Sequence, residues 1–487
     1  MSRLETPILV GVGTATRREQ DYRQALEPLD LMLEALSEAG RDCGNSGMLK
    51  EVERIAIPRG RWKYRNPGGD IAEAIGAVRA ETVLSNVGVL QQTLIASACS
   101  DIASGKIDSA IVAGADAGYR ILRARIAEGY ASERQQETDP HTMLEPAKEL
   151  RHDAELAAGL VMPVGLYALA ESAYRAHAGL SVSEHREYLA KRYSRFSEVA
   201  RENVDAWSRE SRRVNDISEA SDSNPMQAFP YTRAHCSSWN VDQAAALVFC
   251  SESKADALGI APSQRIYPVA SVESNHMTAL SAREHLWRCV GAELSAELLF
   301  RETGMNAQDI DLVDLYSCFP IAVESFAEAA GISRNRDLTI TGGMAYAGGP
   351  YNNYFYQATA KAAQMLRQGQ GRTALLSCVS GIMTKQAFAL WSSCKPDKAF
   401  WTQDVTDSVS AQTSSIDIEP VFTGEGTVVA CTVIYQRDKD PYAVLLVNTQ
   451  TGKRALITSS DKTVIGSVES EEWVGRAVSA DGARLLV

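Results

Sequence analysis

The segment Thr341-Gly342-Gly343-Met344-Ala345-Tyr346-Ala347-Gly348-Gly349-Pro350 stands inside a pattern that the chain shows twice. A strand pattern, a glycine-bearing loop, a helix pattern and a second strand pattern follow one another, at 52–58, 66–69, 91–104 and 109–114 and again at 310–316, 342–343, 357–367 and 374–378. The two strand centres lie 56 residues apart in the first copy (Ile55 to Ile111) and 62 in the second (Val313 to Leu375). The repetition predicts an α/β protein built from two related halves.

Two other parts of the chain do not show this alternation of strand and helix patterns. Residues from about 120 to 225 have a helical period and many charges, which predicts a helical insertion rather than part of a sheet. After about residue 398, short strand patterns alternate with turn residues, which predicts a small all-β domain. The predicted boundaries are 1–125 with 225–265 for the first half, 126–224 for the insertion, 266–398 for the second half and 399–487 for the β-rich domain.

Composition excludes several classes of function. The chain has 487 residues, 45% of them hydrophobic, and no apolar run approaches the roughly 18 residues that a membrane span needs. The net charge of -12 disfavours nucleic acid as a bulk partner, because neutralising phosphates needs a basic surface. The first residues lack the basic-then-apolar order of a signal peptide, so we expect a cytoplasmic protein. The nine cysteines are scattered singly, which predicts neither disulfides nor a metal site.

Four segments resemble, in order and spacing, motifs of the thiolase superfamily. They are Val241-Asp242-Gln243-Ala244-Ala245-Ala246, Tyr316-Ser317-Cys318-Phe319, the segment 341–350 and Cys378-Val379-Ser380-Gly381. The resemblance covers about residues 5 to 395. It implies two similar βαβαβαββ halves in five layers, αβαβα, with a helical loop insertion in the first half. The C-terminal domain would be a small all-β, OB-like addition to this α/β fold.

The same resemblance places residues without reactive side chains at two catalytic positions. Gly88, counted back from Gly105, stands at the position of the nucleophilic cysteine, and Gly349 stands at the histidine of the G-H-P motif. Tyr316 replaces an asparagine or histidine that completes an oxyanion site. Cys378, which resembles the family's second cysteine and acid/base, keeps its side chain. A buried cysteine that only packs and a tyrosine that only lines a pocket are the structural alternatives for this pair.

Binding residues are also implied by the resemblance. The backbone N–H groups of Gly88 and Ser380 would still form an oxyanion hole, with Gly349 and Gly381 lining the same pocket. Ser238 matches a serine that contacts the pantetheine arm. The phosphates of CoA would bind a basic cluster in the insertion, with four candidate arginines, Arg192, Arg195, Arg212 and Arg213.

Without the cysteine no acyl-enzyme can form, so the sequence predicts a thiolase-like protein of acyl or lipid metabolism that binds CoA or acyl-CoA without ordinary thiolase activity. It looks most like thiolase-like proteins of type 1, often labelled acetyl-CoA acetyltransferases. One alternative is a cysteine-independent acyltransferase or retro-aldol C–C lyase that acts on acyl-CoA thioesters through Tyr316 and Cys378. Some relatives that lack the nucleophile are aldolases with a tyrosine at this position. A third alternative is an interaction protein that acts through the C-terminal β-domain.

The expected ligand is therefore CoA or an acyl-CoA thioester, with no covalently bound cofactor. Thiolases dimerise through an edge strand of the core, so both a monomer and a homodimer are open. A protein partner would dock on the C-terminal β-domain.

Overall fold

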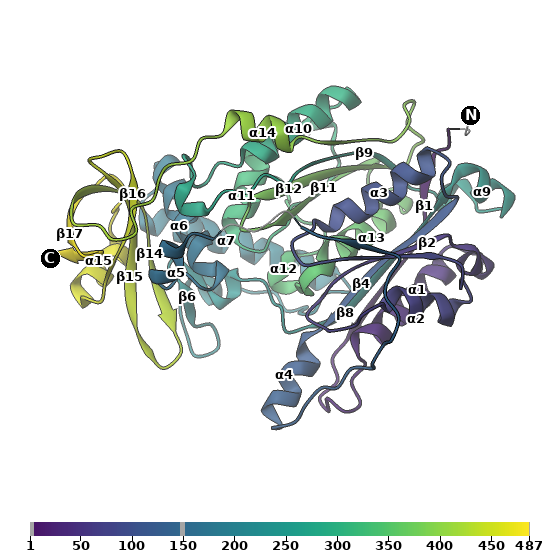
Figure 1. The fold of residues 1–487 in the computed structure, drawn as a ribbon, viewed down its shortest axis with the longest axis horizontal. Coiled ribbons are helices and arrows are strands. Elements are labelled where there is room, and N and C mark those ends of the chain that lie inside the picture. The colour runs from purple at the N-terminus through teal and green to yellow at the C-terminus, as the bar shows by residue number, and fades with distance from the viewer. Residues whose placement is uncertain (1–3, 147–150, 487) are drawn as a thin grey trace.

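The computed structural model describes residues 4–146 and 151–486 and shows two β-sheets beside each other, with a third sheet at one end of the molecule (Figure 1). The predicted domains extend into residues 1–3, 147–150 and 487, which lie outside the described residues. The first sheet contains β1 (Pro7–Arg17), β8 (Asp242–Ser251), β4 (Ser109–Ala117), β2 (Arg54–Pro58), β3 (Glu81–Ser85) and β5 (Thr142–Leu144) in this order. The second contains β10 (Leu312–Asp314), β11 (Thr373–Ser380), β12 (Lys385–Ser392), β9 (Tyr267–Ser274) and β13 (Trp401–Asp404).

The strand directions confirm the predicted duplication. The order β1-β8-β4-β2 in the first sheet corresponds to β9-β12-β11-β10 in the second. In each sheet the first two of these neighbouring pairs are antiparallel and the third is parallel. The two halves of the chain therefore have the same core topology.

Helices separate and cover the two sheets. They are α1 (Pro28–Asp42) and α2 (Pro67–Ile75) outside the first sheet, α3 (Gln91–Ala103) and α13 (Tyr354–Arg367) between the sheets, and α10 (Val290–Thr303) and α11 (Pro320–Ala329) outside the second. The layers follow the predicted order αβαβα, and Figure 1 shows the central pair between the sheets. The interiors on the two sides of each sheet are separate hydrophobic clusters.

Strand β4 shows why the core strands are continuous apolar runs in the sequence. All nine of its residues are buried. Ile111 and Ala113 pack toward α1, while Ala110 and Val112 pack toward the central helices. A strand covered by helices on both faces needs apolar side chains at successive positions, and not only at alternate ones.

The predicted helical insertion is present. It contains α5 (Asp153–Ala157), α6 (Pro163–His177), α7 (Val182–Glu202) and α8 (Val214–Ser218), and follows α4 (Gly118–Ile126). Ser181 is the N-cap of α7. Its hydroxyl accepts a hydrogen bond from Glu184 N–H, and the Glu184 carboxylate accepts one from Ser181 N–H. None of the described helices is long and apolar enough to cross a membrane.

The C-terminal region is β-rich, as predicted, but it is not all-β. Strands β14 (Gly424–Gln436), β15 (Lys439–Thr449), β16 (Arg454–Ser459), β18 (Arg484–Leu486) and β17 (Ala477–Asp481) form a ring that closes through β15 and β14. Two helices accompany them, α14 (Thr406–Gln412) before the ring and α15 (Lys462–Ser470) within it. The predicted small β-domain is thus present, with two helices of seven and nine residues that the sequence pattern did not indicate.

Two segments near the predicted domain boundaries pair with a sheet outside the domain to which the sequence assigned them. The short strands β6 (Met226–Ala228) and β7 (Tyr231–Thr232) join the C-terminal sheet through Ala228 and Ile434 of β14. Strand β13 joins the second core sheet through β9.

An ion pair also connects the C-terminal region to the helical insertion. Arg175 of α6, almost fully buried, forms this ion pair with Glu472 at 2.8 Å. The C-terminal region is thus fixed to the core and the insertion.

Asp242, the first residue of β8, accepts a hydrogen bond from Arg120 N–H, in the first turn of α4, that is shared between both carboxylate oxygens. Burial raises the pKa of its carboxyl from 3.8 to about 7, while hydrogen bonds from backbone N–H groups oppose the rise. Because the pKa is higher in the folded state, the folded protein binds a proton that the unfolded chain has lost. The contribution to stability therefore falls as pH rises from about 4 through 7.

We predict that Asp242→Asn removes this part of the pH dependence. Between pH 5 and 8 the free energy of unfolding should fall by on the order of 2 kcal/mol more in the wild type than in the variant. Urea unfolding at the two pH values measures this difference. Asp397→Asn, at an exposed position, is the control and should behave as the wild type. Equal pH dependence in Asp242→Asn and wild type would contradict the assignment.

Candidate functional site

The central helices begin next to each other, and the side chain of Gln91 joins them. Its Oε1 accepts a hydrogen bond from Phe355 N–H, in the first turn of α13, at 2.8 Å. Its backbone oxygen accepts from Tyr356 Oη at 3.1 Å, and its Nε2 donates to Tyr316 Oη at 3.4 Å. The structure thus places Tyr316 at the start of both central helices.

Cys378 lies in the same cluster, on the face of β11 that points to the central helices. The side chain is fully buried, and burial raises the pKa of its thiol to about 12, although hydrogen bonds from Gln92 and Gln91 N–H oppose the rise. The group is a neutral thiol at neutral pH. It can donate a proton or accept a hydrogen bond, but it is not a thiolate nucleophile.

Tyr316 follows β10, and both its backbone and its ring are held in place. Its backbone N–H donates to Ser377 Oγ at 2.9 Å, and its ring packs edge-on against Tyr354 with centroids 5.5 Å apart. Burial raises the pKa of the phenol well above its usual value of 10, so the phenol stays protonated. Within the described part of the chain the phenol oxygen accepts from Gln91, and its own hydrogen has no acceptor. That hydrogen is available to a ligand.

Gly88 lies three residues before α3 with φ +104°. A Cβ here would lie 3.0 Å from Pro146 Cβ and 3.6 Å from Lys385 Nζ, and Lys385 Nζ donates to Gly88 O at 2.7 Å. The space around the expected nucleophile is therefore filled by a proline and a buried lysine. Lys385 was missed from the sequence, although a lysine at the head of the apolar run 385–392 was a signal for it.

Gly349 and Ser238, both expected in the pocket, are adjacent. Gly349 N–H donates to Ser238 O at 2.8 Å, and Ser238 N–H donates to Met344 O at 2.9 Å. A Cβ on Gly349 would lie 2.0 Å from Ser237 Oγ, so a histidine cannot be placed here without moving that serine. Trp239 is 47% exposed and its ring lies 5.3 Å from the guanidinium of Arg61.

A buried carboxylate holds the segment that leads to Gly349. Asp314 Oδ2 accepts from the hydroxyls of Thr339 and Thr341, at 2.8 and 3.0 Å, and from Ile340 N–H at 3.0 Å. Its Oδ1 accepts from Tyr354 Oη at 2.8 Å. These bonds tie the turn before 342–343, where both glycines have positive φ, to β10 and to α13. Asp314 is a positioning residue for the site.

Ser380 and Gly381 lead into the turn between β11 and β12. Three successive residues of this turn, Gly381, Ile382 and Met383, have φ between 56 and 60°. Left-handed backbone is unfavourable for the two that carry side chains. Arg283 stabilises the turn from behind, because its Nη2 donates to Ile382 O at 2.6 Å.

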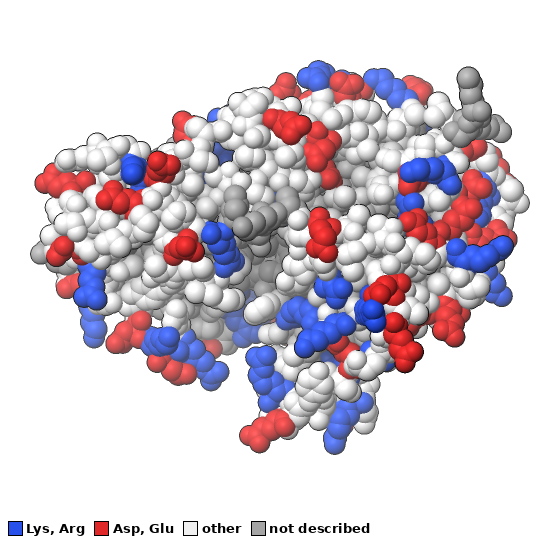
Figure 2. Space-filling model, in the orientation of Figure 1, with Lys and Arg blue, Asp and Glu red and all other residues white. Residues whose placement is uncertain are grey.

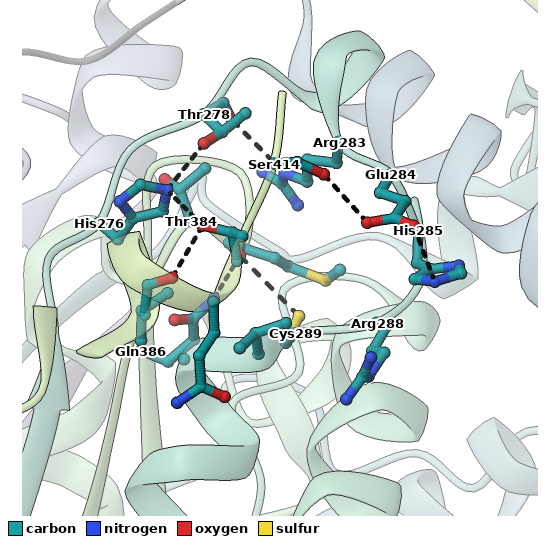
Figure 3. Close-up of a pocket in the computed structure, with 16 residues that line it drawn as sticks. His276, Thr278, Arg283, Glu284, His285, Arg288, Cys289, Thr384, Gln386 and Ser414 are labelled. Carbon is teal, nitrogen blue, oxygen red and sulfur yellow. Dashed lines mark hydrogen bonds and ion pairs between the residues drawn. The ribbon is translucent and has the colours of Figure 1, made fainter. Parts of the chain in front are cut away.

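A pocket of about 90 Å³ lies behind this turn, on the face of the second sheet that α10 covers. Figure 3 shows His276 and Thr278 on one wall, Glu284 and His285 on another, and Thr384 and Gln386 from the turn and β12. His276 Nε2 lies 3.0 Å from Thr278 Oγ1. Burial and the charge of Arg283 lower the pKa of His276, so the imidazole is neutral at neutral pH. None of the residues predicted for the site lines this pocket.

The four arginines predicted to bind CoA phosphates all contact carboxylates. Arg192 pairs with buried Glu324 at 3.5 Å, and its side chain is 9% exposed. Arg195 forms two bonds of 2.8 Å to Asp337. The exposed Arg212 and Arg213 pair with Glu210 and Asp216 respectively. Among the described residues, none of these arginines forms a hydrogen bond or ion pair with Cys378 or Gly88. Figure 2 shows acidic and basic side chains interspersed over the visible face.

Comparison with known proteins agrees with this geometry. No protein-family model matches the chain. The structure is similar to the crystal structure of a monomeric SCP2-thiolase-like protein type 1 from Mycobacterium smegmatis, with a TM-score of 0.84, 25% identity and all of both chains covered. The chain therefore has a thiolase-like fold over its whole length.

Two further matches are more distant. It is 25% identical over 229 residues to the acetyl-CoA acetyltransferase of Methanocaldococcus jannaschii, over 45% of this chain and about half (49%) of that protein. An Ltp2-ChsH2(DUF35) aldolase has a TM-score of 0.61 at 16% identity, covering 80% of this chain and 99% of that one. The comparison with the aldolase shows a similar fold and no more.

We predict that Asp314→Ala lowers the free energy of unfolding by about 3 kcal/mol or more, because several buried donors lose their acceptor together. Urea unfolding followed by tryptophan fluorescence measures the loss. Asp397→Ala, at an exposed position, should change stability by less than about 0.5 kcal/mol. A loss of under 1 kcal/mol in Asp314→Ala would show that Asp314 does not hold the 339–343 turn.

Proposed function

We propose that the protein binds CoA thioesters at the cluster of Tyr316, Cys378 and the start of α3, and that it does not catalyse ordinary thiolysis. The observation that carries this proposal is the filled space at Gly88 within a thiolase fold. Thiolysis passes through an acyl-enzyme, which requires a nucleophilic side chain at this point.

No other group in the cluster replaces the lost chemistry. The thiol of Cys378 is protonated at neutral pH, since burial raises its pKa to about 12. Gly349 provides no base, and Ser237 fills the space next to it. What remains are hydrogen-bond donors that can hold a thioester, namely the phenol of Tyr316 and the backbone N–H groups near Gly88 and Ser380.

The first experiment is calorimetric titration with CoA, acetyl-CoA and acetoacetyl-CoA, followed by mass spectrometry of the mixtures. We expect saturable binding with the thioesters recovered intact. Gly88→Cys should not restore thiolysis, because a side chain at φ +104° is strained and would press against Pro146. Thiolysis of acetoacetyl-CoA by the wild type would refute the proposal, and so would the absence of binding by all three compounds.

A second candidate function is C–C bond cleavage in a 3-hydroxyacyl thioester. The phenol hydrogen of Tyr316 favours it, because this hydrogen has no acceptor among the described residues. In a retro-aldol step a base removes the hydroxyl proton, the Cα–Cβ bond breaks to give a carbonyl compound, and the bonding pair becomes the thioester enolate. Tyr316, being protonated, would return a proton to that enolate carbon.

For this candidate we predict that Tyr316→Phe lowers the cleavage rate by about 100-fold, the usual size of a general-acid contribution. Acyl-CoA affinity should fall by no more than about tenfold, the contribution of one hydrogen bond, because the ring and its packing against Tyr354 remain. The assay is mass spectrometry of the released carbonyl compound. Tyr356→Phe, which removes a hydroxyl that donates to Gln91 O, is the matched control. An unchanged rate in Tyr316→Phe would remove this residue from the mechanism.

Further features of the proposal concern partners and location. For the phosphates of CoA we propose the exposed Arg212 and Arg213, whose ion pairs lie at the surface. A monomer is favoured over a homodimer, because β5 pairs along the outer edge of β3 and the Mycobacterium smegmatis protein is described as monomeric. A role in lipid metabolism, a cytoplasmic location and protein binding through the C-terminal region stay predictions.

A further inference from the structure

The pocket of about 90 Å³ behind the β11–β12 turn has no part in the proposed binding of CoA thioesters. It lies on the opposite face of the second sheet from Cys378, between the turn and the first residues of α10 (Figure 3). A water molecule takes up about 30 Å³ in the liquid, so the pocket can hold a molecule of roughly four to six non-hydrogen atoms. The chemistry of its walls decides which small molecule fits.

Arg283 brings a positive charge to the pocket that no carboxylate neutralises within the described residues. Its Nη2 donates to Ile382 O at 2.6 Å and its Nε to Thr278 O at 3.4 Å, and both acceptors are uncharged carbonyls. Burial lowers the pKa of the guanidinium, because its charge is poorly solvated. The second arginine of the pocket, Arg288, is bonded to both carboxylate oxygens of Glu293 at 2.7 Å. Arg283 is therefore the group with which an anion in the pocket would pair.

Helix α10 begins at the wall of the same pocket. Cys289, Val290 and Gly291 line the pocket, and no side chain caps this helix of 14 residues at Cys289. The first N–H groups of a helix have no partner inside the helix and carry a partial positive charge. The start of α10 therefore favours an anion at the same wall.

Gln386 has an unsatisfied acceptor beside this helix. Its side chain is 3% exposed, and its Nε2 donates to Met383 O. Its Oε1 lies 2.2 Å from the place that a Cβ on Gly291 would take, and it has no hydrogen-bond partner among the residues that the structure describes. An unpaired buried acceptor is unfavourable, and a hydroxyl of a bound molecule would satisfy it. A fully ionised anion such as chloride or acetate has no hydrogen to donate.

The other walls add no second uncompensated cation to the pocket. Burial and the charge of Arg283 lower the pKa of His276, so its imidazole is neutral at neutral pH. Glu284 lies at the exposed rim, next to the exposed His285, and accepts from Ser414 Oγ at 3.1 Å. The apolar part of the wall is formed by Val290, Met383 and Val409. One unpaired positive charge, one free acceptor and a short apolar wall match a monoanion that carries a hydroxyl on a short carbon chain.

We propose that this pocket binds a short hydroxycarboxylate of the size of glycolate or lactate. Its carboxylate pairs with Arg283 and the start of α10, and its hydroxyl donates to Gln386 Oε1. The planar fork of an arginine matches the two oxygens of a carboxylate. Phosphate is a poorer match, because its second charge would face the apolar wall. The inference goes beyond the proposed function and does not rest on it, since none of the residues proposed to bind the thioester lines this pocket.

The test is calorimetric titration of the wild type with glycolate, acetate and phosphate, at constant ionic strength and in a buffer without carboxylates. Glycolate should bind with a dissociation constant of about 1 mM or lower. Acetate lacks the hydroxyl and should bind about 5- to 10-fold more weakly, the usual contribution of one neutral hydrogen bond. Absence of glycolate binding, equal binding of acetate and glycolate, or tighter binding of phosphate would each overturn the proposal.

Gly291→Ala tests the contact with the hydroxyl. Alanine suits a helix better than glycine, and its Cβ would displace Gln386 Oε1. The variant should bind glycolate no more tightly than acetate. Gly466→Ala, on α15, is the matched control, because a Cβ there meets nothing within 4 Å, and it should keep the wild-type preference. An unchanged preference for glycolate in Gly291→Ala would overturn the proposal.

Arg283→Met tests the contact with the carboxylate. Removing the cation should weaken glycolate binding by about 10- to 100-fold, the usual contribution of a hydrogen bond to a charged group. Arg301→Met, at an exposed position in the last turn of α10, is the control and should bind glycolate as the wild type does. Unchanged glycolate binding in Arg283→Met would show that the carboxylate lies elsewhere.

Arg283 also holds the turn through Ile382 O, so a measurement on the wild type covers the case in which Arg283→Met does not fold. In protein with ¹³C-labelled histidines, glycolate should shift the imidazole signals of His276, which lines the pocket. The signals of His141, which is bonded to Thr82 in the first half of the core, should stay in place. Unshifted His276 signals at saturating glycolate would overturn the proposal.

Discussion

Two buried helices that begin at the same point in the core impose the strongest constraint on this molecule. Helices α3 and α13 lie between two sheets, and the N–H groups in the first turn of any helix have no partner within the helix. Gln91 Oε1 accepts from Phe355 N–H in α13, and the N–H groups of Gln91 and Gln92 in α3 act on the Cys378 thiol by opposing the rise of its pKa. The polar cluster of the site therefore exists, in part, because the fold requires acceptors here. Cys378 has a structural task even without a catalytic one.

The β11–β12 hairpin connects this cluster to the rest of the protein. One of its faces carries Cys378 and Lys385, and the other carries Gln386 in the pocket behind the sheet. Its turn is held by Arg283 through Ile382 O. The segment containing Arg283 is held in turn by Arg454 of β16, which donates to Ser281 O at 3.1 Å and Glu284 O at 2.8 Å. The C-terminal sheet thus supports the turn on which the site depends, and this contact gives it a role inside the chain.

The sequence was sufficient to predict the core strands and to identify the functional groups that the site lacks. Strands such as β4 are apolar at every position because both faces are covered, which makes them visible without a structure. Gly88 and Gly349 could be identified as missing functional groups from motif position alone. Strands β6 and β7 could not be found, since two or three residues carry no periodic pattern. The partners of Arg192 and Arg195 lie more than 130 residues away, at Glu324 and Asp337, so the sequence could not show that their charges are engaged. The apolar run 385–392 could have drawn attention to Lys385, but not to its contact with Gly88, which precedes it by 297 residues.

Loss of a nucleophile alone would leave a small empty space, which hydrophobic side chains could fill without cost. Here Pro146 lies closest to that space, and the polar end of a lysine, Lys385 Nζ, lies next to it. Beside it, Gln92 Oε1 is buried and has no hydrogen-bond partner within the described residues, and the phenol hydrogen of Tyr316 has no acceptor there. Unpaired buried polar atoms each cost about 1–3 kcal/mol. A bound ligand with both donors and acceptors would offset these costs, whereas a purely structural core would gain stability by replacing the groups with apolar ones. The retained polarity of the site is thus better explained by ligand binding than by packing.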